Sequence, residues 1–361
     1  MLLGEAVRGA SAVYVTELGL PVRRPRPFAP GHTAGVTTGV TSELSPRFRA
    51  WVPGRPVPVG SILSSLRRGG ADPCHRIQPD GVVWRATRTV DGMGGSVLLR
   101  LEPRPAEGAV HAHAWGPGAD VALDGVPLLL GDGDDPGGFV PRPQHRRLAQ
   151  ALRAHPHWRP CRTGAVFEAL AAAALEQRVT GGEAHAAWRM LVTSFGELAP
   201  GPAGVPGSFA AGMRVPPTPQ QWAAIPSWEW LRAGVEEARR RVVVAAAAVA
   251  HRLERTVGLP GEEAARALRT VPGIGVWTAA EVRQRAHGDA DAFSWNDFHV
   301  AKNVSWALAG NVLDDAGCAE LVECYRGHRY RVQRLLELDG VARPRRAPRM
   351  TLPTHLPKVP R

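Results

Sequence analysis

The segment from Leu268 to Asp297 holds the residues whose types and spacing could do chemistry. It begins with LRTVPGIGVWT, in which two glycines flank Ile274, and it ends about one helix and one loop later with Asp297. A carboxylate held beside a reacting centre can stabilise developing positive charge or activate a water molecule. The alternative is structural, because the segment SWND from Ser294 also fits a capping box that opens a helix toward Leu308.

A turn between two helices precedes this carboxylate and must position it. Pro272 forces the chain to turn, and Gly273 and Gly275 let the backbone adopt conformations that a side chain would forbid. A second helix is expected to begin at Val276 to Thr278, where free backbone N–H groups favour an anion such as a phosphate. A helix-turn-helix without a ligand is the alternative, because the P-G-I-G turn alone is a modest signal.

Residue patterning divides the remaining chain into a strand-rich part and a helix-rich part. Short alternating segments broken by Gly, Pro and Asp predict an antiparallel α+β domain over residues 51–140. Apolar residues spaced three and four apart then predict an all-α domain over residues 141–340. The fold class is therefore α+β. Strands are expected at 81–89, 96–103 and 109–115, and helices at 145–155, 165–179, 183–195 and 235–253.

Both ends of the chain have the composition of extensions. Residues 1–50 are rich in Pro, Gly, Thr and Arg without sustained periodicity, which is typical of a poorly ordered arm. A mis-assigned start codon explains the same residues equally well. Residues 341–361 contain basic and no acidic side chains, which predicts a disordered basic tail.

The charge balance favours a polyanionic partner, with nucleic acid ahead of anionic lipid. The chain has 44 basic and 33 acidic residues and a formal net charge of +11. A GC-rich genome that encodes arginine freely accounts for the same excess, since the only lysines are Lys302 and Lys358. The longest apolar run, Val242–Ala250, is too short to span a bilayer. No membrane association and a cytoplasmic location are therefore expected.

The four cysteines are scattered and show no C-x-x-C spacing. This arrangement argues against a zinc site or an iron–sulfur cluster, and it is typical of a reducing compartment.

Three segments together resemble the helix-hairpin-helix DNA glycosylases, in particular the branch of the bacterial 3-methyladenine DNA glycosylase II. They are VPGIGVWTA from Val271, GDADAF from Gly288, and SWNDFH, and the resemblance covers roughly residues 140–340. It implies a TATA-binding-protein-like antiparallel domain followed by an all-α helix-hairpin-helix domain. Asp297 stands at the place of the catalytic aspartate, which would stabilise the oxocarbenium-like sugar or activate water as a flipped, damaged base leaves duplex DNA.

The resemblance also implies the reaction type and part of the base pocket. Lyase members have a Schiff-base lysine at the position of Trp277, so hydrolysis without strand cleavage is expected, and the indole is the expected wall of the pocket. Glu281 and Arg334 stand where the relatives have aromatic residues, so an aromatic cage for a cationic alkylated base is incomplete. Trp295 would line this pocket or pack in the core. The alkylated base is therefore the less specific part of the prediction.

DNA contacts and one cation complete the implied site. Gln177 and Arg178 match residues that enter the DNA helix, with Arg178 as the wedge, and an exposed helix end is the alternative. The hairpin would bind the phosphate backbone through Gly273, Gly275, Trp277 and Thr278. The backbone carbonyls of Arg269, Val271 and Ile274 would hold a monovalent cation, Na⁺ or K⁺.

The chemistry itself requires no cofactor, and the absence of a clustered four-cysteine motif separates the chain from the iron–sulfur members. The predicted function is a monofunctional DNA glycosylase of base excision repair, acting as a monomer at the nucleoid. The alternatives are a non-catalytic DNA-binding or damage-sensing protein, a glycosylase of different lesion specificity, and a glycosylase-lyase.

Overall fold

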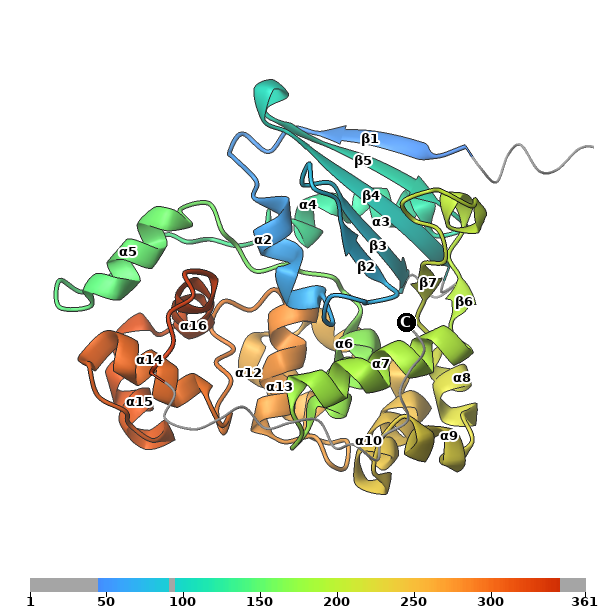
Figure 1. Ribbon diagram of the computed structural model, residues 1–361. Coiled ribbons are helices and arrows are strands. Elements are labelled where there is room, and N and C mark those ends of the chain that lie inside the picture. Colours follow the sequence, from blue (N-terminus) through green and yellow to red (C-terminus); the bar gives the residue numbers. More distant parts are fainter. Residues whose placement is uncertain (1–44, 91–94, 345–361) are drawn as a thin grey trace, which may run out of the picture. The chain divides into compact units, whose positions relative to one another are not determined.

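The computed structural model describes residues 45–90 and 95–344 (Figure 1). The predicted arm up to residue 44 and the predicted tail from residue 345 lie outside the described residues. The strands and helices of the described residues all belong to one compact unit. The division into a sheet domain and a helical domain at residue 140 therefore stays a prediction.

Five antiparallel strands form one sheet in the order β1-β5-β4-β3-β2 (Figure 1). In the register of β4 with β5, Leu99 faces Ala114 and Leu101 faces Ala112, and all four are buried. Because side chains alternate between the faces of a strand, this register gives the sheet one apolar face. The strands are β1 Arg47–Trp51, β2 His75–Ile77, β3 Val83–Arg88, β4 Ser96–Arg104 and β5 Ala109–Trp115.

The structure confirms the three predicted strands and adds two. Strand β1 begins at Arg47, inside the segment that was expected to be an arm, and pairs with β5. Its side chains are mostly exposed, so its sequence does not show the alternation of a half-buried strand. Strand β2 has three residues, which is too short for any periodic pattern.

Short helices pack on the apolar face of the sheet, and a short ribbon covers part of the other face. The ribbon pairs β6 with β7 and carries Ala203 and Met213 against Trp84 and Trp115. The ribbon lies within residues 141–340, which were predicted to be all-α, so that prediction is wrong at this point. Strands of two residues are too short to show a periodic pattern in the sequence. These elements are α2 Val59–Leu63, α3 Ala119–Asp124, α4 Val126–Leu129, β6 Glu197–Leu198 and β7 Arg214–Val215.

Helix α6 (Val166–Glu176) lies at the centre of the helical part, and nine of its residues are buried. Its alanines leave little side-chain bulk, and α10 and α13 both pack against it. Helix α7 (Gly181–Phe195) begins with a capping box between Thr180 and Glu183. The other helices of this part are α5 Arg146–Ala154, α8 Pro219–Ala224, α9 Ser227–Arg232, α10 Glu237–Ala248 and α11 Ala250–Glu254.

The predicted hairpin is present as α12 (Gly261–Leu268), a turn, and α13 (Val276–Val282). Val271 and Ile274 are buried in the turn. Gly273 has φ +86°, and a Cβ there would lie 2.4 Å from Val242 Cγ2, so only glycine fits. Gly275 has ordinary extended backbone and open space around it. The requirement for glycine predicted at both positions therefore applies to Gly273 alone.

A π-helical turn, Arg283–His287, follows α13 without interruption. The loop after it leads through Asp297 to the last three helices, which are α14 Val300–Ala309, α15 Asp315–Val322 and α16 Arg329–Leu338.

Candidate active site

Asp297 and Trp277 meet directly in the structure. The indole Nε1 of Trp277 donates a hydrogen bond to Oδ2 of Asp297 across 3.0 Å, although 20 residues separate the two. Both side chains are half-buried. The carboxylate therefore lies beside the start of α13, and its neighbour there is the indole N–H of Trp277.

The other oxygen of Asp297 caps helix α14. Oδ1 accepts hydrogen bonds from the backbone N–H groups of His299 (2.8 Å) and Val300 (3.0 Å). Asp297 therefore both caps a helix, which was the structural alternative, and contacts Trp277, and it uses a different oxygen for each. Ser294 does not take part in the cap, contrary to the predicted capping box, because its hydroxyl donates to Glu281 instead.

The turn that presents Asp297 has a constrained backbone. Asn296 has φ +65°, a left-handed conformation that asparagine adopts more readily than most residues. Its N–H donates to Oδ1 of Asp315 at the start of α15 (2.9 Å). The N–H of Asp297 donates to the Ser294 carbonyl oxygen (3.3 Å), which closes the turn.

Ser294 is fully buried and anchors this turn through all of its hydrogen-bonding capacity. Its hydroxyl donates to Glu281 Oε1 (2.6 Å) and accepts from Gln284 Nε2 (2.8 Å) and Gln333 Nε2 (3.1 Å). Its N–H donates to Gln333 Oε1 (3.1 Å). A hydroxyl has one proton and two lone pairs, so this group is saturated. The turn before Asp297 is thereby tied to α13, to the π-helical turn and to α16.

Glu281, predicted as a pocket residue, lies 7% exposed with both carboxylate oxygens engaged. Oε1 accepts from Ser294, and Oε2 accepts from Arg285 Nη1 across 2.6 Å. Arg285 Nε also donates to the carbonyl of Ser65 (3.0 Å). Burial alone would lower the pKa of Arg285, but the charges of Glu281, Glu176 and Tyr330 and the hydrogen bond to Glu281 together raise the pKa above its ordinary value. The charge of Glu281 is thus neutralised within the fold.

Arg334 and Trp295, the other predicted pocket residues, have partners elsewhere. Arg334 donates to Ser64 Oγ (2.6 Å) and Glu337 Oε2 (2.8 Å), while its buried Nε has no partner among the described residues. The ring of Trp295 packs 4.2 Å, centroid to centroid, from Phe293. Within the described residues, no hydrogen bond, ion pair or ring contact joins either side chain to Trp277 or Asp297.

Gln177 and Arg178 follow α6 and have different surroundings. Gln177 Nε2 donates to the carbonyl of Gly273 (3.1 Å) and to Thr278 Oγ1 (2.9 Å), so this side chain holds the hairpin. Arg178 is exposed and has φ +58°, a conformation that costs a non-glycine residue about 1 kcal/mol. The DNA contact of Arg178 stays a prediction.

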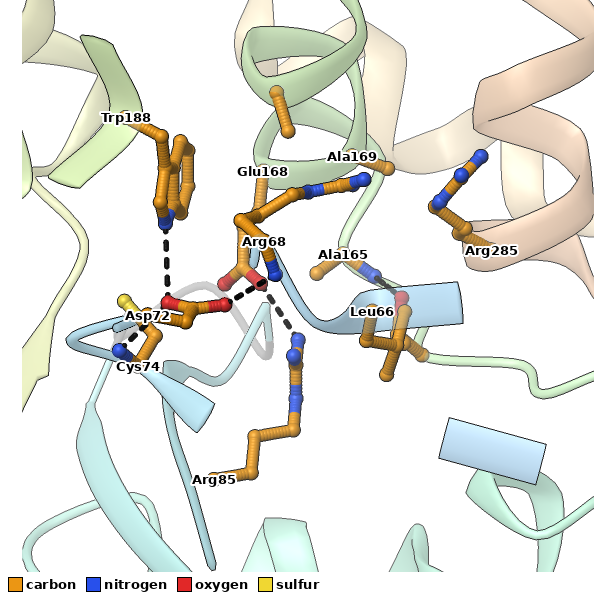
Figure 2. A pocket seen from close by; sticks show the side chains of 12 residues that line it. Leu66, Arg68, Asp72, Cys74, Arg85, Ala165, Glu168, Ala169, Trp188 and Arg285 are labelled. Carbon is orange, nitrogen blue, oxygen red and sulfur yellow. Dashed lines mark hydrogen bonds and ion pairs between the residues drawn. The ribbon is translucent and has the colours of Figure 1, made fainter. Parts of the chain in front are cut away.

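A polar hollow lies between the sheet and helices α6 and α7 (Figure 2). Glu168 Oε1 accepts from Arg85 Nη2 (2.6 Å), and Asp72 accepts from the backbone N–H of Arg68 (2.6 Å) and from Trp188 Nε1 (3.3 Å). The hollow is not lined by Trp277 or Asp297. Arg85 pairs with Glu168 inside the hollow, whereas Arg68 and Arg285 pair with Glu176 and Glu281 outside it, so each of these charges has a partner within the fold.

The predicted cation site uses backbone carbonyls of the hairpin and stays a prediction. Arg269 directly follows α12, so its carbonyl has no intrahelical N–H partner. The Val271 carbonyl accepts the Ile274 N–H (3.1 Å) and keeps a second lone pair. Carbonyl oxygens of this kind suit a hard cation. Among the described residues there is also no group of three His, Cys, Asp or Glu side chains able to hold a metal ion.

Known structures share this fold. No protein-family model matches the sequence, and no curated protein matches it. The chain is similar to a 3-methyladenine DNA glycosylase from Archaeoglobus fulgidus, with TM-score 0.61 and 18% identity over 81% of this chain and 98% of that one. It is also similar to a Clostridium acetobutylicum 8-oxoguanine glycosylase/lyase solved with double-stranded DNA, with TM-score 0.57 and 9% identity over 78% and 92% of the chains.

The chain therefore has the fold of the helix-hairpin-helix DNA glycosylases. At these identities the likeness establishes the fold, while the chemistry must be argued from the residues. The described residues also contain no helix with the length and apolar character needed to cross a bilayer.

Four residues of the site were not predicted from the sequence in the roles that the structure shows. Ser294 and Gln333 give no signal because their partners come from other elements. Phe298, beside Asp297, is 70% exposed, and the Lys302 ammonium lies 4.2 Å from its ring centroid. Arg285 could have been found, because Glu281 and Arg285 have the i,i+4 spacing of a helical ion pair.

Proposed function

We propose that the protein is a monofunctional DNA glycosylase of base excision repair. The observation that supports this proposal best is the contact of Asp297 with Trp277 beside the hairpin, within the glycosylase fold. The side chain at position 277 is an indole and has no amine, so the proposed chemistry is that of the Asp297 carboxylate.

The proposed reaction is hydrolysis of the bond between C1′ of deoxyribose and the base nitrogen. The bond breaks with both electrons leaving on the base, and positive charge develops on the sugar. Asp297 stabilises this charge, or takes a proton from the water whose oxygen bonds to C1′. The products are the free base and an abasic site in an intact strand.

The lysines support hydrolysis without a lyase step. A lyase needs an amine that attacks C1′ and forms an imine, which an indole cannot do. Lys302 is the only lysine of the described residues, and its ammonium lies over the ring of Phe298. Lys358 lies outside the described residues. Borohydride should therefore trap no covalent complex with abasic DNA.

The proposed DNA surface comprises the hairpin and Arg178. Pro272, Gly273, Gly275 and Val276 are exposed, and a phosphate can approach the backbone where glycines lack side chains. A monovalent cation on the hairpin carbonyls would add positive charge there. The excess of arginine over acidic residues suits a duplex bound through its backbone, so affinity should fall steeply as salt increases.

The lesion has two candidates. An alkylated purine, already a good leaving group, is the first, because hydrolysis then needs no general acid. A neutral damaged base is the second, and the Glu281–Arg285 ion pair favours it: the carboxylate that could attract a cationic base is already neutralised. We further propose that the protein acts as a monomer in the cytoplasm, at the nucleoid.

One panel tests the proposal. Duplexes carrying 3-methyladenine, 7-methylguanine, hypoxanthine, uracil or 8-oxoguanine are incubated with excess protein, and released base is measured. Release of any one of them, abolished in Asp297→Asn, is the expected result. Binding without release from every duplex would identify a non-catalytic DNA-binding protein instead.

A further inference from the structure

We propose that Trp277 acts through its indole N–H as a positioning residue, which holds Oδ2 of Asp297 toward the reacting sugar. This inference rests on the proposed function and assigns Trp277 a role other than that of a pocket wall. The observation behind it is the 3.0 Å hydrogen bond from Nε1 of Trp277 to Oδ2 of Asp297.

The two carboxylate oxygens of Asp297 are unequally occupied. An ionised carboxylate has about four acceptor positions, two on each oxygen. The N–H groups of His299 and Val300 fill both positions of Oδ1. Trp277 fills one position of Oδ2. Among the described residues, the last position on Oδ2 has no donor, so Oδ2 is the oxygen available to a water molecule or to the charge at C1′.

The three donors come from two different elements. His299 and Val300 belong to the start of α14, whereas Trp277 belongs to the first turn of α13 behind the hairpin. Rotation about the Cβ–Cγ bond moves both oxygens together, and the two hydrogen bonds on Oδ1 still leave the carboxylate some freedom to turn. The indole N–H removes this freedom, so the hairpin that is proposed to bind the DNA backbone also orients the catalytic oxygen.

This role differs from stacking in what it requires of the side chain. Stacking against a flipped base needs a flat ring and does not depend on the N–H group. Positioning of Oδ2 needs the N–H donor and tolerates any ring that places it. The two roles are therefore separated by a residue that keeps the bicyclic ring and lacks the donor.

The test replaces Trp277 with 3-benzothienylalanine, in which sulfur substitutes for the N–H group of the same bicyclic ring. Trp277→Phe removes the donor but also part of the ring, so the analogue, and not this variant, separates positioning from stacking. The full-length protein is assayed under single-turnover conditions on the duplex from which the wild type releases base, and its affinity for that duplex is measured separately. We expect the rate of base release to fall about 10- to 100-fold, because a hydrogen bond to a charged group is lost. Affinity should change by less than about twofold.

Trp230 provides a matched control. Its buried Nε1 donates to the carbonyl of Ile225 (3.2 Å) in the α8–α9 region, so 3-benzothienylalanine at 230 deletes the same kind of hydrogen bond elsewhere. This control should lose some thermal stability and keep the rate of base release. An equal loss of rate in both proteins would indicate a general structural effect and overturn the inference.

The remaining outcomes separate the inference from the proposed function. If the wild type releases base and the analogue at 277 does so at the same rate, the positioning role is wrong while the glycosylase remains. A fall in affinity at an unchanged rate would assign Trp277 to stacking and also overturn the inference. If the wild type releases no base from any duplex, the proposed function fails and the inference falls with it.

Discussion

The side-chain amide of Gln177 lies 2.9 Å from the hydroxyl of Thr278, and so connects the end of α6 to the first turn of α13. The same amide donates to the carbonyl of Gly273, the one turn residue that must be glycine. Gln177, which was expected to enter the DNA helix, thus binds the hairpin through its side chain. Arg178, which is proposed to contact DNA, and Gln177, which holds the hairpin, are adjacent in sequence.

Gln177→Ala should loosen the hairpin without unfolding the protein. Two hydrogen bonds are lost, but water can reach the exposed Gly273, so the free energy of unfolding should fall by only about 1 kcal/mol. Affinity for duplex DNA should fall as well. Urea denaturation and DNA titration measure the two effects. Gln221→Ala removes an exposed capping amide from α8 and should leave DNA affinity unchanged; if both variants lose affinity equally, the hairpin is not the cause.

Arg178 should contribute to DNA affinity while its backbone conformation lowers the free energy of unfolding. Arg178→Ala removes the guanidinium and keeps the left-handed backbone, whereas Arg178→Gly removes the guanidinium and relieves the strain at φ +58°. Both variants should bind DNA more weakly, and Arg178→Gly should exceed Arg178→Ala in unfolding free energy by about 1 kcal/mol. Thermal denaturation and the salt dependence of binding test this. Unchanged affinity in both variants would place Arg178 outside the DNA interface.

Two substitutions at Asp297 should separate its role in base release from its role as the cap of α14. Asparagine keeps an oxygen that can accept from His299 and Val300, so Asp297→Asn should retain the cap, the fold and DNA affinity, while base release is abolished. Asp297→Ala also removes the cap, and its unfolding free energy should fall by about 1 kcal/mol more. Circular dichroism, denaturation and single-turnover assays distinguish these effects. Base release by Asp297→Asn at the wild-type rate would remove this residue from the chemistry.

Sequence patterns predicted the elements whose structure depends on residues close together in the chain. The hairpin, strands β4 and β5 and the place of Asp297 follow from turn residues, alternation and spacing along the chain. Strand β1 could not be predicted because its pairing joins Phe48 to His113, far apart in sequence. The contact between Asp297 and Trp277 depends in the same way on the path of the intervening loop.

The pocket residues illustrate a second limit. Glu281 and Arg334 were placed by position relative to known glycosylases, and position does not show which partners a charged side chain finds. The ion pair of Glu281 with Arg285 could have been predicted, because the two residues are four apart in a helical segment. The hydroxyl of Ser294, which joins Glu281 to the turn of Asp297, comes from a loop whose course only the structure shows.

His75 should make the stability of the protein sensitive to acid. The ring is buried, and neither nitrogen has a hydrogen-bond partner among the described residues. Burial, together with the nearby Arg85, Arg67 and Arg68, lowers the pKa of His75 to about 3. The unfolded chain therefore binds a proton more readily than the folded one, and unfolding is favoured as pH falls from about 6.5 toward 3. At pH 5.0 the expected cost is about 2 kcal/mol relative to pH 7.5.

His75→Leu should remove this part of the pH dependence, since an apolar side chain leaves no buried nitrogen without a partner. Urea denaturation at pH 5.0 and pH 7.5 gives the difference for each protein, and it should shrink by about 2 kcal/mol in the variant. His287, whose pKa burial lowers to about 4, acts in the same direction and remains in both proteins. The exposed His157 is the control, and His157→Gln should keep the wild-type difference. The same difference in His75→Leu as in the wild type would mean that the ring at 75 takes up its proton in the folded protein.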